Sequence, residues 1–170
     1  DSYPREVEEK IVIDAAFFDI DGVLTDGAVY VDAQGNETKR ILFDDIDAIF
    51  ELKRSGVKIG FITGEDTDFC KYVQRRFEPD FFFTGCKDKL AVFKKLIDET
   101  GLDKNRVCYV GDSRKDIELL QFVEYSFVPS DVELKVQESS KNVLQTPRGK
   151  GVIKEVVAQI LNLDNRLSSS

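Results

Sequence analysis

Short apolar runs alternate with amphipathic stretches along most of this 170-residue sequence. Such alternation is typical of strand–helix–strand units, in which parallel strands are covered by helices on both faces. Each run is short, rich in Val, Ile, Phe or Tyr, and apolar on both sides, as a strand between two helical layers must be. The expected strands are Ile11–Ile20, Val57–Ile62, Phe81–Phe83, Val107–Val110 and Tyr125–Val128.

The amphipathic stretches between these runs predict helices. Gly56 and Gly101 stand where a helix commonly ends on a glycine. Asp66, Ser113 and Asp131 are suited to cap helix N-termini with a side-chain oxygen. The expected helices are Asp45–Ser55, Asp66–Arg76, Asp88–Thr100, Ser113–Gln121, Asp131–Ser139 and Val152–Leu161.

One segment breaks the alternation. The runs Ala28–Val31 and Thr38–Phe43 flank Asp32-Ala33-Gln34-Gly35-Asn36, a turn-forming sequence, and therefore predict a β-hairpin inserted after the first strand. No repeat is present, and low complexity is confined to the last three serines. We expect residues 1–170 to form a single α/β domain with a doubly wound, mostly parallel, Rossmann-like sheet and a hairpin over residues 28–43.

Charge and composition exclude several classes of partner. The net charge is -8 and no long basic run occurs, which argues against nucleic acid or an anionic membrane as the main partner. No stretch approaches the roughly 18 apolar residues of a membrane span, and no signal-peptide pattern opens the sequence. The three cysteines lack metal-ligand spacing and indicate free thiols. A cytoplasmic location is expected.

The sequence contains no histidine at all. A Ser-His-Asp or Cys-His mechanism therefore cannot operate. Acid–base chemistry in this chain must come from Asp, Glu, Lys or Tyr.

Polar residues stand where the expected strands end. In an open α/β sheet, ligands bind outside the carboxyl ends of the strands, so these side chains should meet at one edge. They are Asp19 and Asp21 after the first strand, Thr63 and Gly64 after the second, Lys89 beyond the third, and Asp112 with Asp116 after the fourth.

This set of residues suits phosphoryl transfer. A carboxylate is ionised at neutral pH, so Asp19 can attack phosphorus without an activating base. Asp21 can protonate the leaving oxygen and later activate water. Crowded carboxylates repel one another, and Mg²⁺ resolves that repulsion with oxygen ligands from Asp19, Asp112 and a backbone carbonyl.

The phosphate itself needs donors and positive charge. Thr63 and the Gly64 amide can hold phosphate oxygens, and Lys89 supplies a cation. Alone, each motif has an ordinary structural explanation, such as a helix-entering turn or a solvated charge. A calcium loop is excluded because Val23 and Tyr30 occupy positions that must carry ligands. The joint occurrence of all four motifs, in order and each at a strand end, favours the functional interpretation.

The four motifs resemble those of the haloacid dehalogenase superfamily. They are Asp19-Ile-Asp-Gly-Val-Leu-Thr-Asp-Gly, Ile62-Thr-Gly, Asp88-Lys89 and Gly111-Asp-Ser-x-x-Asp116. The sequence is most similar to the branch without a large cap, which acts on the sugar-acid phosphates KDO 8-phosphate and KDN or acylneuraminate 9-phosphate. The resemblance runs from about Ile11 to Leu161 and includes the hairpin and Arg148-Gly-Lys-Gly-Val-Ile.

This resemblance implies a Mg²⁺-dependent phosphomonoesterase that works through an aspartyl-phosphate. Two departures from the branch pattern occur, at Asp45-Ile-Asp-Ala48-Ile49 and at Gly111-Asp112-Ser113, where the branch favours further glycines and a second Asp, respectively. The implied roles are Asp19 as nucleophile, Asp21 as acid/base, Thr63, Gly64 and Lys89 on phosphate, Asp19, Asp21 and Asp112 on Mg²⁺, and Asp116 as support for the metal site.

The expected substrate is a phosphorylated 2-keto-3-deoxy sugar acid. Within the resembling branch, an acid at Glu65 with a cation at Arg76 is similar to the nine-carbon enzymes, which favours KDN or acylneuraminate 9-phosphate over KDO 8-phosphate. Glu65 can equally be a first-turn acid favoured by the helix dipole. Arg148 or Lys150 can reach a substrate carboxylate.

The hairpin predicts a homotetramer. A two-stranded ribbon is marginal alone, and exposed apolar surface of this kind usually marks an interface. Members of the resembling family pack such hairpins into a shared barrel, in which neighbouring subunits roof each active site. The apolar hairpin residues are Ala28, Val29, Val31, Ile41, Leu42 and Phe43.

Two other functions compete with the enzyme. A non-catalytic domain that tetramerises a nucleotide-sugar (CMP-sialic acid) synthetase tends to lose the motif acids, and none is lost here. A response-regulator receiver normally carries its phosphorylated Asp on a middle strand, whereas Asp19 and Asp21 follow the first strand.

Overall fold

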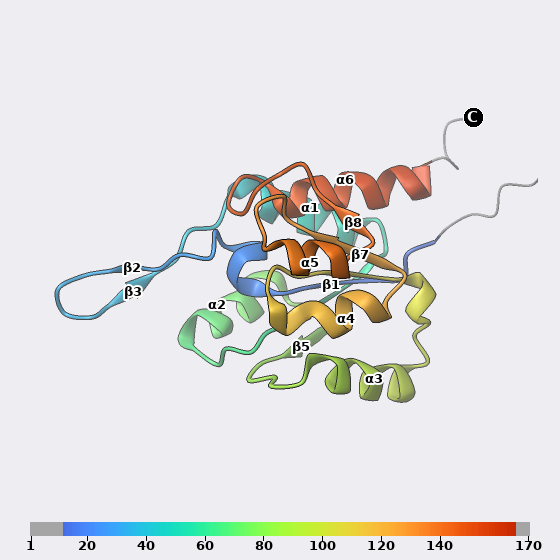
Figure 1. Cartoon of the computed structure of the whole chain (residues 1–170), viewed down its shortest axis with the longest axis horizontal. Helices are drawn as coiled ribbons and strands as arrows, with labels where there is room; N and C mark the ends of the chain where they lie inside the picture. The colour runs from blue at the N-terminus through green and yellow to red at the C-terminus, as the bar shows by residue number, and fades with distance from the viewer. Residues whose placement is uncertain (1–11, 166–170) are drawn as a thin grey trace, which may run out of the picture.

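A six-stranded parallel sheet forms the centre of the molecule (Figure 1). The computed structural model describes residues 12–165. The strand order is β5-β4-β1-β6-β7-β8, and every neighbouring pair runs parallel. The strands are β1 Ala15–Phe18, β4 Lys58–Ile62, β5 Phe81–Phe83, β6 Val107–Val110, β7 Tyr125–Val128 and β8 Asn142–Val143.

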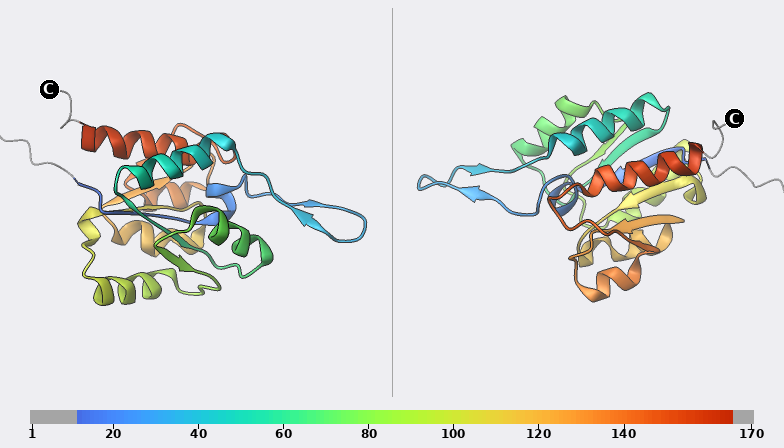
Figure 2. Two further views of the ribbon diagram at one scale, coloured as in Figure 1. Left: turned by 180° about the vertical axis from the view of Figure 1, so that it is seen from behind. Right: turned by 90° about the horizontal axis from the view of Figure 1, so that it is seen from above.

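Helices cover both faces of this sheet, so two hydrophobic cores lie on either side of it (Figure 2). Helices α1, α2 and α6 pack on one face, and α3, α4 and α5 pack on the other. The expected doubly wound α/β fold is confirmed. The helices are α1 Phe43–Arg54, α2 Asp68–Phe77, α3 Lys89–Thr100, α4 Ile117–Phe122, α5 Leu134–Ser139 and α6 Val152–Asn165.

Strand β1 shows why these apolar runs become central strands. Ala16 and Phe18 enter one core while Ala15 and Phe17 enter the other, so the two-residue period of a strand fills both. The neighbouring strand makes room through Gly60, where a Cβ would lie 2.3 Å from the Phe17 ring. A buried strand of this kind places its carboxyl end firmly.

The observed elements agree with the predicted ones except at their ends. The first strand is shorter than expected, and Ile11 lies outside the described residues. Strand β8 was not predicted, because its two residues are exposed and carry no apolar pattern. Two predicted caps are wrong. Thr67, not Asp66, precedes α2, and the Asp131 carboxylate accepts a hydrogen bond from the Arg148 N–H instead of capping α5.

The predicted hairpin is present and projects from the body in every view (Figures 1 and 2). Its antiparallel strands are β2 Tyr30–Val31 and β3 Glu37–Thr38. The Asp32 carboxylate closes the turn by accepting from the Gln34 and Asn36 N–H groups. The return run is strand only at its start, since the chain already enters α1 at Phe43.

A bridge between Thr25 and Ile41 fixes the root of the hairpin to the loop after β1. Helix α1 continues through Asp45-Ile46-Asp47-Ala48, so the departure from the glycine-rich pattern leaves the helix start intact. Within residues 12–165, no helix has the length and apolarity required to cross a bilayer.

Candidate active site

Two loops meet at the carboxyl edge of the sheet, one after β1 and one after β6. The β1 loop turns tightly over Ile20–Leu24, and Gly22 adopts a φ of +84° within it. A Cβ on Gly22 would lie 1.8 Å from the Asp112 Oδ2 atom. Glycine is therefore required here both for its backbone conformation and for the close approach of the second loop.

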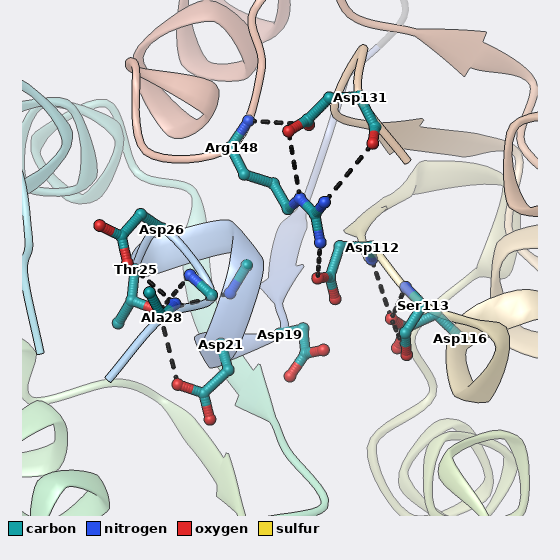
Figure 3. Close-up of polar contacts among 12 residues, drawn as sticks. Asp19, Asp21, Thr25, Asp26, Ala28, Asp112, Ser113, Asp116, Asp131 and Arg148 are labelled. Atoms are coloured by element: carbon teal, nitrogen blue, oxygen red, sulfur yellow. Dashed lines mark hydrogen bonds and ion pairs between the residues drawn. The ribbon is translucent and has the colours of Figure 1, made fainter. Parts of the chain in front are cut away.

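The two loops bring three carboxylates together (Figure 3). One oxygen from each of Asp19, Asp112 and Asp116 lies within 4.8 Å of the other two. Asp19 and Asp116 are buried, and Asp112 is partly buried. A group of carboxylate oxygens at this spacing fits a hard divalent cation such as Mg²⁺.

Asp116 anchors the loop after β6. Its carboxylate accepts hydrogen bonds from the Asp112 N–H at 2.9 Å and the Ser113 N–H at 3.1 Å. The buried Tyr109 hydroxyl also donates to it, and the Lys89 ammonium lies 2.7 Å away. Both oxygens of Asp116 already accept hydrogen bonds from this chain. Asp116 is therefore better suited to support the metal site than to be a principal ligand of the metal.

Lys89 lies between two of the acids. Its Nζ atom is 3.1 Å from Asp19 Oδ2 and 2.7 Å from Asp116 Oδ1, and its side chain is only 4% exposed. Burial alone would lower the lysine pKa, but the charges of Asp19 and Asp116 outweigh burial and raise it. The same ammonium, against the effect of burial, lowers the pKa of Asp116.

The nearby positive charges do not offset the burial of the other two carboxylates, Asp19 and Asp112. Burial, and then the neighbouring Asp116, raises the pKa of Asp19 well above its usual value. The same two causes raise the pKa of Asp112 to about 6, although Arg148 opposes them. An additional cation would relieve both carboxylates, which is the electrostatic condition for a metal site.

Asp21 points away from the three-carboxylate cluster (Figure 3). Its Oδ1 atom accepts from the Lys39 ammonium at 2.9 Å and from the Thr25 hydroxyl at 3.4 Å. The Asp21 side chain is 33% exposed, so it is accessible to solvent and to a substrate. The carboxylate thus stands apart from the cluster, and a metal contact from this residue would fall to its backbone carbonyl.

Thr63 and Gly64 lie at the end of β4, the strand beside β1. The Thr63 side chain is buried, and its hydroxyl accepts from the Glu65 N–H at 3.2 Å. Gly64 is exposed, and a Cβ there would meet nothing closer than the Cys86 carbonyl at 3.5 Å. The backbone at Gly64 is therefore accessible to a ligand.

The predicted substrate residues are distributed unevenly around the site. The Arg148 guanidinium lies 3.8 Å from Asp112 and is held by Asp131 at 3.3 Å. Lys150 is exposed on the same loop. Glu65 is exposed beyond Thr63.

Arg76 lies beside an aromatic ring and lines a hollow. Its guanidinium lies 6.0 Å from the Phe50 ring centroid, and the side chain helps to line a hollow of about 530 Å³. Lys39, which contacts Asp21, lines the same hollow.

Sequence reasoning missed Lys39, Tyr109 and Asp131. Lys39 is 18 positions from Asp21, and no local pattern indicates that contact. Tyr109 could have been identified from the sequence, because it lies on β6 just before the Gly111-Asp112 motif and its hydroxyl requires a hydrogen-bond partner when buried.

Comparison with known proteins defines the class of this fold and site. A family model described as haloacid dehalogenase-like hydrolase matches residues 28–122, more than half of the chain. The chain belongs to the haloacid dehalogenase-like hydrolase family. Within that family it is an enzyme of the phosphatase type.

Named relatives and solved structures extend over most of the chain. The 3-deoxy-D-manno-octulosonate 8-phosphate phosphatase of Haemophilus influenzae is 27% identical over 150 residues, which cover 88% of this chain and 83% of the relative. A cobalt-bound deoxy-D-mannose-octulosonate 8-phosphate phosphatase structure from that organism has a TM-score of 0.84 at 27% identity, covering 92% of this chain and 91% of the other.

Two further matches differ in kind. A probable YrbI-family phosphatase structure from Pseudomonas syringae has a TM-score of 0.87 at 30% identity and covers 94% of this chain and 91% of that chain. N-acylneuraminate cytidylyltransferase A of Danio rerio is 29% identical over 156 residues, but the match covers 88% of this chain and only 35% of the relative.

Proposed function

We propose that this chain is a Mg²⁺-dependent phosphatase that hydrolyses a phosphorylated sugar acid through an aspartyl-phosphate on Asp19. The observation that carries the proposal is the convergence of Asp19, Lys89 and Asp112 at the carboxyl edge of the sheet, with Asp19 3.1 Å from the lysine. Residues 12–165 act as one catalytic domain in this proposal.

The chemistry follows from the positions of the side chains. The Asp19 carboxylate attacks phosphorus, and the bond from phosphorus to the ester oxygen breaks as the new bond forms. Asp21 gives a proton to the departing oxygen and then takes one from the water that hydrolyses the aspartyl-phosphate. Inorganic phosphate leaves, and the Asp19 carboxylate is restored.

Positive charge and donors stabilise the phosphate during both steps. Lys89 lies beside the nucleophile, and Thr63 with the Gly64 amide supplies donors from the neighbouring strand end. Asp19, Asp112 and the backbone carbonyl of Asp21 would hold Mg²⁺, and Asp116 would hold the loop that carries Asp112. When bound, the metal ion offsets the repulsion between the phosphate and the carboxylates.

The leading substrate candidate is KDO 8-phosphate. The named phosphatase from Haemophilus influenzae acts on that compound and covers most of this chain, which supports the choice. The nine-carbon acids KDN and acylneuraminate 9-phosphate are the second candidates, because Glu65 is exposed just after Thr63 and Gly64, and Arg76 lines a hollow together with Lys39. In either case Arg148, with Lys150 on the same loop, would bind the substrate carboxylate.

The synthetase alternative rests on the partial match to N-acylneuraminate cytidylyltransferase A. Every motif acid is retained in this chain, and the carboxylate cluster is assembled. Those two observations favour a working enzyme over a domain that only assembles a larger protein.

The proposal includes a homotetramer built through the hairpin. Val29, Tyr30 and Val31 are 47%, 57% and 58% exposed, and Phe43 at the start of α1 is 76% exposed. Apolar surface on a projecting two-stranded ribbon supports an interface between copies of the chain.

Phosphate release from a panel of esters tests the function. We expect turnover of p-nitrophenyl phosphate in Mg²⁺ and a higher kcat/KM for KDO 8-phosphate than for KDN 9-phosphate or acylneuraminate 9-phosphate. A clear preference for a nine-carbon ester would move the assignment to the second candidates. Absence of phosphate release from every ester, with Mg²⁺ present, would overturn the phosphatase itself.

A further inference from the structure

Lys39 is an unusual residue in an exposed segment. The neighbouring positions from Gly27 to Thr38 are all exposed, yet the Lys39 side chain is only 10% exposed. The chain has just left β3, and the lysine turns inward at the root of the hairpin. Burying an ammonium is costly unless it is paired, so this position requires an explanation.

Two contacts hold the Lys39 ammonium. It lies 2.9 Å from Asp21 Oδ1, and it stands 5.0 Å from the centroid of the Phe69 ring on α2. The carboxylate satisfies the charge, and the aromatic face adds an attraction for the cation. A lysine fixed on two sides in this way restricts the side chain that it contacts.

The two oxygens of the Asp21 carboxylate have different surroundings. Oδ1 accepts from Lys39 and from the Thr25 hydroxyl. Within residues 12–165, Oδ2 receives no hydrogen bond from the protein. The two donors therefore fix Oδ1, and Oδ2 is the oxygen of Asp21 that stays available to a substrate.

We propose that Lys39 is a positioning residue for catalysis: it fixes Oδ1 of Asp21, so that Oδ2 delivers the proton to the leaving group. The inference rests on the proposed role of Asp21 as the acid/base. It also means that the hairpin, through its root, contributes to the chemistry of its own subunit.

The test uses leaving groups of different basicity. The sugar alcohol released from KDO 8-phosphate needs a proton, whereas p-nitrophenolate leaves readily without one. The comparison is made in kcat/KM, which ends with departure of the leaving group and so excludes the later hydrolysis of the aspartyl-phosphate. Lys39→Met keeps the alkyl stem against Phe69 and removes the ammonium.

We expect Lys39→Met to lower kcat/KM for KDO 8-phosphate by about 10- to 100-fold, a part of the full contribution of a general acid. The value for p-nitrophenyl phosphate should fall less than about threefold, and Lys39→Arg should restore most of the loss. Arg40→Met is the matched control. Arg40 binds Asp26 and the Gly149 carbonyl at the same root but does not touch Asp21.

Equal losses on both esters would overturn the inference, since a loosened site slows every substrate alike. A loss in Arg40→Met that matches Lys39→Met would also overturn it, because the effect would then belong to the hairpin root in general. An inactive wild-type protein would instead refute the proposed function. An active wild type with an unaffected Lys39→Met variant would refute this inference alone.

Discussion

The carboxylate cluster and the hairpin are built in opposite ways. In the cluster, charged side chains from the loop after β1, from α3 and from the loop after β6 are buried or partly buried and contact one another within a single chain. In the hairpin, Val29 and the β2 residues Tyr30 and Val31 carry apolar side chains that the described part of the chain leaves exposed. The carboxylates of the cluster all come from one chain, whereas the hairpin surface is where we propose that another copy of the chain binds.

This difference predicts which property each region controls. Changes in the cluster should remove activity and leave the assembly intact. Changes on the exposed hairpin surface should alter the assembly first. Lys39 is the exception, since it joins the hairpin root to Asp21.

The largest effect is expected from Asp19→Asn. The carboxamide is nearly the same size as the carboxylate but is a far poorer nucleophile, so kcat should fall by at least about 10³-fold. The sedimentation coefficient and the circular dichroism spectrum should match those of the wild type. Steady-state assays with p-nitrophenyl phosphate in Mg²⁺ measure the loss, and substantial residual turnover would exclude covalent catalysis at this residue.

Asp112→Ala should act through the metal site. Loss of this carboxylate should weaken Mg²⁺ binding and lower activity at least about 100-fold, and excess chelator should abolish the wild-type activity. Calorimetric titration with Mg²⁺ measures the binding. Asp131→Ala is the control, because Asp131 also contacts Arg148 but lies outside the cluster. Normal Mg²⁺ affinity in Asp112→Ala would remove this residue from the ligand set.

Val31→Lys tests the exposed hairpin surface. We expect sedimentation to shift from tetramer to smaller species, because a charge on the hairpin surface opposes its burial between subunits. If neighbouring subunits cover each active site, Val31→Lys should also lose about 10-fold in kcat/KM for the sugar-acid ester. Its activity on p-nitrophenyl phosphate should be kept. Leu134→Lys is matched to it, since Leu134 on α5 is 66% exposed and Val31 is 58% exposed. A wild-type monomer with full activity would contradict the tetramer and the shared site together.

The contrast also explains what sequence reasoning could reach. Asp19, Thr63 and Asp112 were placed correctly at strand ends, because a buried apolar run followed by a polar residue marks both the strand and its end. Caps were harder to assign. Asp66 and Asp131 have the right chemistry, but neighbouring residues decided where α2 and α5 begin.

Contacts made by residues away from the strand ends could not be predicted. The pairing of Lys39 with Asp21 depends on how the hairpin returns to the body, and the approach of Arg148 to Asp112 depends on the loop before α6. The sequence indicated that Arg148 or Lys150 can reach a substrate carboxylate, but it did not indicate that Asp131 holds the Arg148 guanidinium. Such contacts are set by tertiary structure and have no local period.

The smallest effect concerns Asp45, a buried acid on α1 that belongs to neither region. It follows the hairpin on α1, and its carboxylate accepts from the Lys154 N–H at the start of α6 at 2.9 Å. Burial raises its pKa to about 6, and the helix amides only partly oppose that rise. A variant of Asp45 therefore measures how burial of an acid affects stability, without the additional effect of neighbouring acids in the carboxylate cluster.

The sign of the pH dependence follows from this raised pKa. Because the folded protein holds the proton more tightly than the unfolded chain, ionised Asp45 costs stability above about pH 6, and the cost disappears as the pH falls toward 4. Asp45→Asn keeps an oxygen acceptor for the Lys154 N–H and removes the charge. We expect it to raise the free energy of unfolding by about 1–2 kcal/mol at pH 7.5, or a few degrees in Tm, and by about half as much at pH 5. Thermal unfolding of both proteins at the two pH values measures the difference. A variant that is less stable than the wild type at pH 7.5 would mean that the negative charge at the start of α6 stabilises the protein more than its burial costs.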